Sequence, residues 1–361
     1  MKKITFTTLM MVVVFLGCQK KKMTLTFLDE LVVKDSLQFG TTVIGGLSGI
    51  DRYKDQYYMV VDDARNPRIL QADILIDEDQ IQAVNFNNII KLKDTTSSFY
   101  NSNALDLESV FIDAGGKLNL VSEGSIRKGK DPLVFTIDIN SRAVTEFIVP
   151  DYFKASSKEK PKHNGVFEGS SRGFSTDGFW VAMEAPLRAD GEEPTFHKTQ
   201  SPVRITYFNN KTKLAEKQYA YELEKIDKPA KGKINLNGVT AILEYQEGKF
   251  LVVERIYQSG YGSHGNVVRI FNAFADKETT NTLALRSLKK EAYIPLKKEL
   301  LLDFDSIQKE LTEGIIDNIE GITFGPTLSN GNQSVILISD DNFQVYGKQL
   351  NQFILLEIHN K

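Results

Sequence analysis

A motif that recurs five times along the chain constrains the fold more than any other feature of the sequence. Each copy has a small or acidic residue followed by Gly or Ser, a short apolar strand, a turn, and a second apolar strand ending in an acid. The copies begin at Leu47-Ser48-Gly49-Ile50, Leu107-Glu108-Ser109-Val110, Phe167-Glu168-Gly169-Ser170, Leu236-Asn237-Gly238-Val239 and Ile319-Glu320-Gly321-Ile322. Counted from Ser48, Glu108, Glu168, Asn237 and Glu320, the spacing is 60, 60, 69 and 83 residues. Such recurrence indicates a repeat architecture.

Each unit has room for two more strands beyond the two that carry the motif. The second strands of the units are residues 57–63, 118–123, 179–184, 250–254 and 335–341. Candidates for third and fourth strands in the second and third units are residues 133–139, 143–149, 203–208 and 214–221. Turns such as Ala114-Gly115-Gly116-Lys117 separate the first two strands, as a hairpin requires.

Four short strands per unit, repeated around an axis, are typical of a β-propeller. We therefore predict an all-β propeller with five four-stranded blades. Six blades are the alternative, because the long fourth unit also contains residues 291–303 and a predicted short helix near residues 305–311. The last unit ends one strand short, and residues 25–33 form an unassigned strand near the start. Pairing of that strand with the last blade would close the ring and cover an exposed edge.

The N-terminal residues are typical of an export signal. Lys2 and Lys3 precede an apolar run that is shorter than the about 20 residues of a membrane span. The run ends in Phe15-Leu16-Gly17-Cys18, which resembles the lipobox of bacterial lipoproteins, where the Cys thiol receives the lipid. We predict a signal peptide over residues 1–17, a lipidated Cys18 with a tether over residues 18–24, and one propeller domain over residues 25–361. The alternative is an ordinary signal peptide in which Cys18 has no role.

These features predict a lipid-anchored protein of the bacterial cell envelope, which contacts the membrane through its anchor. We expect it on the periplasm-facing side of the outer membrane, because no acidic run follows Cys18. Lys+Arg 44 against Asp+Glu 47 leaves no basic excess, so nucleic acid is not an expected partner. Four His and one Cys exclude zinc fingers, iron–sulfur clusters and disulfides within the chain. We expect a monomer.

The repeated segments also resemble a known family. Short motifs across residues 40–345 carry the resemblance, among them Asp106-Leu107-Glu108-Ser109-Val110, Asn164-Gly165-Val166-Phe167-Glu168-Gly169, Val253-Glu254-Arg255 and Ser339-Asp340-Asp341-Asn342-Phe343. They are similar to the family named for the esterase-like activity of phytase, a group of exported bacterial β-propeller proteins. The resemblance implies a propeller fold and hydrolysis of esters or phosphoesters. Ser48 and Asn237 depart from the pattern, because the other three units carry Glu there.

In a propeller, equivalent positions of all blades converge on the central axis. One such tier would contain Glu108, Glu168 and Glu320, which we predict to be catalytic, together with Ser48 and Asn237. A second tier would contain the acids that end the second strands: Asp62, Asp63, Glu123, Glu184, Glu254, Asp340 and Asp341. So many carboxylates cannot all stay ionised unless a positive charge neutralises them. We therefore predict that the acids of both tiers bind a metal, with Ca²⁺ favoured over zinc by the oxygen ligands.

Arginines follow the second-tier acid in four of the units: Arg65, Arg127, Arg188 and Arg255. A guanidinium beside a cation suits an anionic substrate, so these arginines, with Asn164 and Asn237, are the predicted substrate-binding residues. The alternative is that the arginines pair with the acids and hold neighbouring blades together.

Two other motif matches are rejected. Gly169-Ser170-Ser171-Arg172-Gly173 has the spacing of a nucleophile elbow, which needs a strand-to-helix turn, but a hairpin is predicted here. Gly260-Tyr261-Gly262-Ser263-His264-Gly265 has the spacing of a dinucleotide fingerprint, but residues 266–274 are predicted to form a strand rather than a helix. His163 is either a general acid or base near the axis or a loop histidine without a catalytic role.

Two functions fit this set of residues. The first is metal-dependent hydrolysis of a phosphorylated or otherwise anionic ester, in which Glu168 takes the proton of the attacking water. The second is a non-enzymatic propeller that binds a glycan, a peptide or a protein at the cell envelope.

Overall fold

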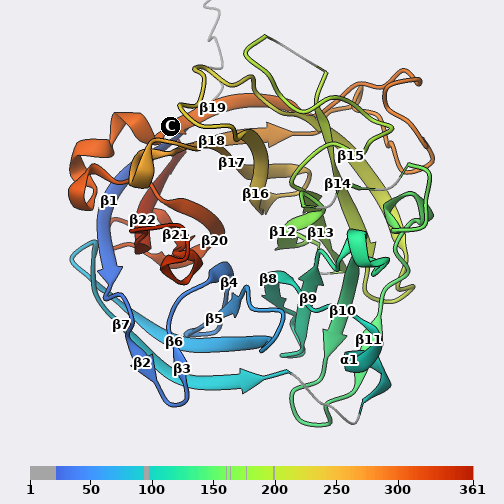
Figure 1. Ribbon diagram of the computed structural model, residues 1–361. Helices are drawn as coiled ribbons and strands as arrows, with labels where there is room; N and C mark the ends of the chain where they lie inside the picture. Colours follow the sequence, from blue (N-terminus) through green and yellow to red (C-terminus); the bar gives the residue numbers. More distant parts are fainter. Residues whose placement is uncertain are drawn as a thin grey trace, which may run out of the picture.

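Five four-stranded antiparallel sheets stand around a central axis in the computed structural model (Figure 1), which describes residues 22–92, 97–159, 161–162, 164–175, 177–197 and 200–360. The signal peptide and Cys18 lie outside the described residues. The first two blades comprise β4 (Leu47–Tyr53), β5 (Gln56–Val61), β6 (Arg68–Asp77) and β7 (Gln80–Lys91), then β8 (Leu107–Ile112), β9 (Leu118–Ser122), β10 (Leu133–Ile137) and β11 (Val144–Glu146). The five-bladed propeller is confirmed.

The other three blades follow the same order from the axis outward. They comprise β12 (Phe167–Arg172), β13 (Gly178–Met183), β14 (Pro202–Asn209) and β15 (Ala215–Glu222); β16 (Asn235–Gln246), β17 (Lys249–Gln258), β18 (Asn266–Phe274) and β19 (Lys297–Asp303); and β20 (Asn318–Thr327), β21 (Gln333–Asp340), β22 (Asn351–Asn360) and β1 (Met23–Val33). A small hairpin of β2 (Gln38–Phe39) and β3 (Thr42–Val43) precedes the first blade, and α1 (Ser98–Ser102) precedes the second.

The last blade is completed by the N-terminal strand, as predicted. β1 pairs antiparallel with β22, from Met23 opposite Asn360 to Val33 opposite Asn351. The strand begins two residues earlier than the sequence suggested. The edge of β22 is therefore covered, which removes a template for pairing with another chain.

The long fourth unit does not hold a sixth blade among the described residues. Residues 297–303 form β19, the outer strand of the fourth blade. The predicted helix near residues 305–311 is instead a series of short 3₁₀ turns, at Phe304–Ser306, Gln308–Glu310 and Thr312–Gly314. In the described part of the chain we find no helix of sufficient length and hydrophobicity for a membrane span.

The second strand of each blade is nearly all apolar because neighbouring blades cover both of its faces. All residues of β9 and β13 are buried, and so are most of those in β5, β17 and β21. Buried apolar side chains from adjacent blades merge into shared clusters, in which Phe111 of β8 packs with Phe179 of β13 at a ring-centroid distance of 4.6 Å. This packing sets the position of the inner strands.

Hydrogen bonds join the five inner strands into a ring about the axis. The Ser48 hydroxyl donates to the carbonyl of Leu107 at 2.8 Å, and the Thr240 hydroxyl donates to the carbonyl of Ile319 at 2.7 Å. The remaining neighbours are linked by Ser109 with Ser170, by Ser171 with Glu244 and by Arg52 with Thr323. Each inner strand is therefore hydrogen-bonded to both of its neighbours around the axis.

Candidate axial carboxylate site

Each inner strand contains a β-bulge at the same phase of the repeat. The bulged residues are Ser48, Glu108, Glu168 with Gly169, Thr240 and Glu320, judged from the shift in pairing between each inner strand and its neighbour. The member from the fourth blade is therefore Thr240, and the expected axial place of Asn237 is wrong by three residues. A bulge bends the strand and redirects its side chain, which is how these residues come to a common axis.

The second tier has a similar correction. In each blade, the residue just before the bulge pairs with one residue of the second strand. These paired residues of the second strands are Val61, Ser122, Met183, Glu254 and Ser339. The next residue in each blade is Asp62, Glu123, Glu184, Arg255 and Asp340. The fourth blade therefore contributes a cation, Arg255, at the position where the others contribute an acid, and Glu254 is one residue out of phase.

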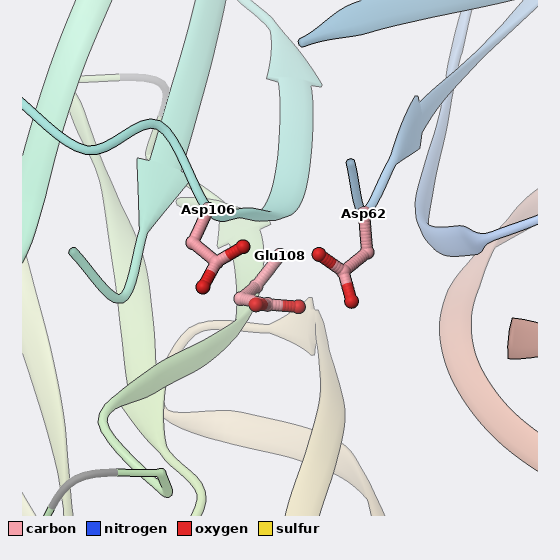
Figure 2. Close-up of side chains that lie close together, drawn as sticks. All are labelled: Asp62, Asp106 and Glu108. Carbon is pink, nitrogen blue, oxygen red and sulfur yellow. The ribbon is translucent and has the colours of Figure 1, made fainter. Parts of the chain in front are cut away.

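Carboxyl groups from the first three blades lie close together near the central axis, where the inner strands begin. Figure 2 shows Asp62, Asp106 and Glu108 with their carboxyl groups pointing toward one another, and one oxygen from each lies within 4.8 Å of the others. Glu108, Glu123 and Glu168 form a second such group. Because Glu108 belongs to both groups, the five residues make one continuous cluster, called here the axial cluster.

Burial and mutual repulsion raise the pKa of every acid of this region for which a shift is resolved. The pKa of Asp62 rises to about 8, first through burial and then through the charges of Asp106 and Asp340. Burial also raises the pKa of Glu123 to about 8, with Asp106 and Glu184 adding repulsion. For Glu108 and Glu168, burial followed by the surrounding carboxylates holds the pKa well above the usual value.

Arg255 is the cation that the described structure places among these acids. Its Nη2 atom lies 3.3 Å from Oε1 of Glu184 and 3.6 Å from Oε1 of Glu320. Burial raises the pKa of Glu320 to about 8, and Arg255 opposes that rise. Burial likewise raises the pKa of Glu184, again against the charge of Arg255. Glu320 also accepts a hydrogen bond from Asn318 at 2.7 Å. One guanidinium thus faces a surplus of carboxyl groups.

Glu254 is occupied by donors outside the axial cluster. Its Oε1 atom accepts hydrogen bonds from Tyr221 at 2.6 Å and from Lys298 at 2.8 Å, and its Oε2 atom accepts from the backbone of Glu224 and from Asn237 at 2.9 Å. Asn237 therefore positions Glu254 instead of facing the axis. Glu254 thereby joins Tyr221 of β15, in the third blade, to Lys298 of β19, in the fourth.

The second acid of each Asp-Asp pair also has local partners. Asp63 forms an ion pair with the buried Arg68 at 2.9 Å. Asp341 accepts hydrogen bonds from Gly46, Phe343, Gln344 and Asn351, and so anchors the turn after β21. Its neighbour Asp340 is buried, which raises its pKa well above the usual value, and Glu320 adds repulsion. Asp62 and Asp340, the first of each pair, are the ones that interact with the axial acids.

The other predicted substrate contacts lie in exposed loops at this end of the propeller. Arg65, Arg127, Arg188 and Asn164 are all exposed. Arg127 belongs to the 3₁₀ turn Ile126–Lys128 and follows Glu123 by four residues. Of the four arginines, Arg255 is the one that stands in β17 and forms ion pairs with Glu184 and Glu320. His163 lies outside the described residues.

Asp106 is a member of the axial cluster that the sequence analysis did not select. It stands before β8, two residues ahead of Glu108, at the phase occupied by Gly46, Val166, Gly238 and Asn318 in the other blades. Because no other blade has an acid there, the repeat gave no reason to choose it. Its place in the motif Asp106-Leu107-Glu108 was the available signal.

The residues of the axial cluster fit a hard divalent cation. All candidate ligand atoms are carboxylate oxygens, which Ca²⁺ prefers and which zinc sites seldom use alone. Oε2 of Glu123 is buried and has no hydrogen-bond partner among the described residues. A buried carboxylate oxygen without a partner is costly, and a bound cation would remove that cost.

Comparison with known proteins gives one family and several distant structures. Residues 42–343 match the sequence profile of the family described as "Phytase-like: Esterase-like activity of phytase". No curated protein matches the chain. An endo-arabinase from Bacteroides thetaiotaomicron VPI-5482 is similar at a TM-score of 0.46 and 10% identity, over 88% of this chain and 95% of that one.

Two other solved structures show the same level of similarity. A glycosyl hydrolase from Bacteroides ovatus has a TM-score of 0.42 and 11% identity, with 86% of this chain and 84% of that chain covered. The Malassezia sympodialis allergen Mala s 1 has a TM-score of 0.41 and 10% identity, with 87% and 78% covered. Similarities this distant say nothing about what the present chain binds or converts.

Proposed function

Since the chain belongs to the phytase-like family named for the esterase-like activity of phytase, as its motifs predicted, we propose that it is a metal-dependent hydrolase of phosphate or other anionic esters. The observation that carries this proposal is the position of the axial cluster beside Arg255, which contacts Glu184 and Glu320 from the fourth blade. A cation site and a guanidinium on one axis together suit an anionic ester.

In this proposal, the residues of the axial cluster and Arg255 have different roles in binding the cation and the substrate. Asp62, Asp106, Glu108 and Glu123 supply the oxygen ligands of the cation, for which we propose Ca²⁺. A cation held by these carboxylates would supply a positive charge that polarises the ester oxygen and lowers the pKa of an attacking water. Arg255, whose side chain is 15% exposed, would bind the anionic group of the substrate with its guanidinium.

Glu168 is the proposed general base. It belongs to the group with Glu108 and Glu123, and Arg255 lowers its pKa against the rise caused by burial and by Glu184. Because it interacts with both the ligand carboxylates and Arg255, we assign it the role of accepting the proton of the attacking water. Glu320, held by Asn318 and near Arg255, would orient the guanidinium toward the substrate.

A hydrolysis screen tests the proposal. The purified protein is incubated with p-nitrophenyl phosphate, phytate and p-nitrophenyl acetate, each with Ca²⁺ and with a chelator. We expect turnover of at least one phosphoester that needs Ca²⁺ and is reduced about 100-fold or more by Glu168→Gln. Arg255→Gln should mainly raise KM. Glu299→Gln is the matched control, because Glu299 is exposed on the outer strand β19.

A negative screen would favour the alternative function. Absence of turnover on all three substrates, combined with tight binding of an envelope glycan, peptide or protein, would indicate a binding propeller. We also propose that the protein acts as a monomer at the bacterial cell envelope, held by a lipid on Cys18. The basic start, the apolar run and the Gly17-Cys18 junction support this location.

A further inference from the structure

A cavity lies on the axis, farther along the inner strands than the axial cluster. Residues from the middle and later parts of all five inner strands line it, and its volume is about 340 Å³. The axial cluster is built at the beginnings of those strands, whereas the cationic residues of this cavity, Arg52 and Arg172, stand near the ends of β4 and β12. Arg172 follows Glu168 by four residues, which in a strand is about 13 Å. The volume is in the lower range of small-molecule sites.

Three cationic side chains line the cavity: Arg52, Lys54 and Arg172. The Arg172 side chain is 38% exposed, and its Nη2 atom donates to Asp51 at 3.0 Å. The Lys54 ammonium is exposed and has no carboxylate within ion-pair distance in the described part of the chain. These side chains therefore keep N–H groups for an external partner.

Both acids that line the cavity are engaged within the protein. Asp51 accepts hydrogen bonds from the backbone of Ile112 at 2.7 Å and from Arg172. Glu244 accepts from the backbone N–H groups of Phe174 at 2.6 Å and Gly248 at 2.7 Å. Burial raises the pKa of Asp51, against the charge of Arg172, and it also raises the pKa of Glu244. The cavity is thus electrostatically suited to an anion.

Aromatic rings form the apolar part of the same cavity. Phe111 is buried in its wall, Phe324 is partly buried, and Phe174 is 58% exposed. An exposed large aromatic ring at the edge of a cavity offers a surface for a flat apolar group. The combination of cations and aromatic rings differs from the axial cluster, where carboxylates dominate.

We propose that this cavity binds a small organic anion with an aromatic body, its carboxylate or phosphate held by Arg172 and Lys54 and its ring packed against Phe174 and Phe324. Arg52 adds positive charge, although its Nη atoms already contact Gly325 and Asp55. The site is independent of the proposed hydrolysis, because it shares no residue with the axial cluster.

Titration calorimetry with simple probes tests the site. The purified protein, kept in chelator, is titrated with phenyl phosphate, benzoate and inorganic phosphate. We expect saturable binding of phenyl phosphate or benzoate, with the comparison showing which head group is preferred. Arg172→Gln should weaken that binding about tenfold or more, and Lys54→Gln by several-fold. Phe174→Ala should weaken it as well. Lys309→Gln should leave the binding unchanged, because Lys309 is exposed on a 3₁₀ turn and does not line the cavity.

Three results would overturn the proposal. The first is no saturation by either aromatic probe in the millimolar range. The second is binding of inorganic phosphate as tight as that of phenyl phosphate, which would mean that the aromatic rings contribute nothing. The third is binding that survives Arg172→Gln and Lys54→Gln but is lost in Arg255→Gln, which would place the anion at the axial cluster. Because Lys54 is exposed, its variant keeps the test valid if Arg172→Gln disturbs folding through Asp51.

Discussion

Glu108 is shared by both groups of carboxylates in the axial cluster. Arg255 acts electrostatically on Glu168 and forms an ion pair with Glu320. These three side chains are buried or nearly so, and each carries a pKa raised by burial. Their charge state is therefore tied to whatever positive charge is nearby. A cation, protons or Arg255 can supply that charge, and the three possibilities predict different responses to substitution.

Changing Glu108, Glu168 and Glu320 together to Gln should abolish the rise in Tm that we expect Ca²⁺ to cause. A ligand that binds only the native state stabilises it by mass action, so losing the ligand oxygens removes the effect. Melting curves of the wild type, the triple variant and Glu299→Gln, each with Ca²⁺ and with chelator, provide the measurement.

Two other patterns would argue against the cation. If the acids only repel one another, the triple variant would be more stable than the wild type with or without Ca²⁺. If Arg255 alone neutralises them, the variant would be destabilised under both conditions, because the guanidinium would lose Glu168 and Glu320 and keep Glu184 as its remaining ion-pair partner among the described residues. A wild-type curve indifferent to all divalent cations would remove the metal from the proposed mechanism.

The raised pKa values also predict how stability depends on pH when no cation is present. Asp62, Glu123 and Glu320 titrate near 8 in the folded protein but start from ordinary values of 3.8 and 4.5. Between these values the folded state holds more protons than the unfolded state, so the free energy of unfolding should fall as pH rises from about 5 to about 8. Denaturant titrations in chelator at several pH values measure this slope.

The comparison that isolates the axial acids is the same titration on the triple Gln variant, whose slope should be smaller. Added Ca²⁺ should also reduce the slope in the wild type, since cation binding displaces protons. A free energy of unfolding that rises over this pH range in chelator would contradict the assignment.

At the scale of the strand, close approach between inner strands depends on small residues beside the bulges. A Cβ atom added at Gly169 would lie 2.8 Å from Cα of Ala241 and from the backbone nitrogen of Ile242. Backbone atoms cannot move aside as a flexible side chain can. Gly49 faces Ser109 in the same way, with 2.8 Å to its Cα atom.

Gly169→Ala should therefore lower the free energy of unfolding by about 1–3 kcal/mol, the usual range for overpacking. Gly115→Ala is the control, because its added Cβ would meet only the Asp113 carboxylate at 3.2 Å, in an exposed turn. Urea denaturation of both variants gives the two values. Equal stability of Gly169→Ala and the wild type would mean that the third and fourth blades are less tightly joined than described.

The repeat predicted the strands and the closure of the ring because period and apolar pattern are local properties of the sequence. It misplaced Asn237 and Glu254 because register is not local. Asn237-Gly238 resembles Glu168-Gly169 and Glu320-Gly321, but β16 begins at Asn235 and its bulge falls at Thr240. Only the pairing with β17 reveals that Thr240 and Arg255 hold the axial positions. Asp106 was missed for a related reason, since it belongs to one blade and to no repeat.

For the molecule as a whole, we expect the location of the propeller to depend on Cys18. Cys18→Ser should abolish incorporation of labelled fatty acid and remove the protein from the membrane fraction, because the thiol is the only one in the chain. Lys21→Ser, in the predicted tether, should leave both unchanged. Membrane fractionation of Cys18→Ser that matches the wild type would disprove the lipid anchor.

Closure of the last blade by β1 also determines the order in which the chain can fold. Four blades are built from contiguous segments, but Val33 finds its partner Asn351 only after 318 further positions, counted as 351 − 33. Bringing such distant segments together costs loop entropy and slows folding. The sheet of β20, β21 and β22 therefore keeps an unpaired edge on β22 until β1 pairs with it. During that interval a β1 strand from another copy could pair with β22 instead, so assembly into swapped chains competes with the final step of monomer folding.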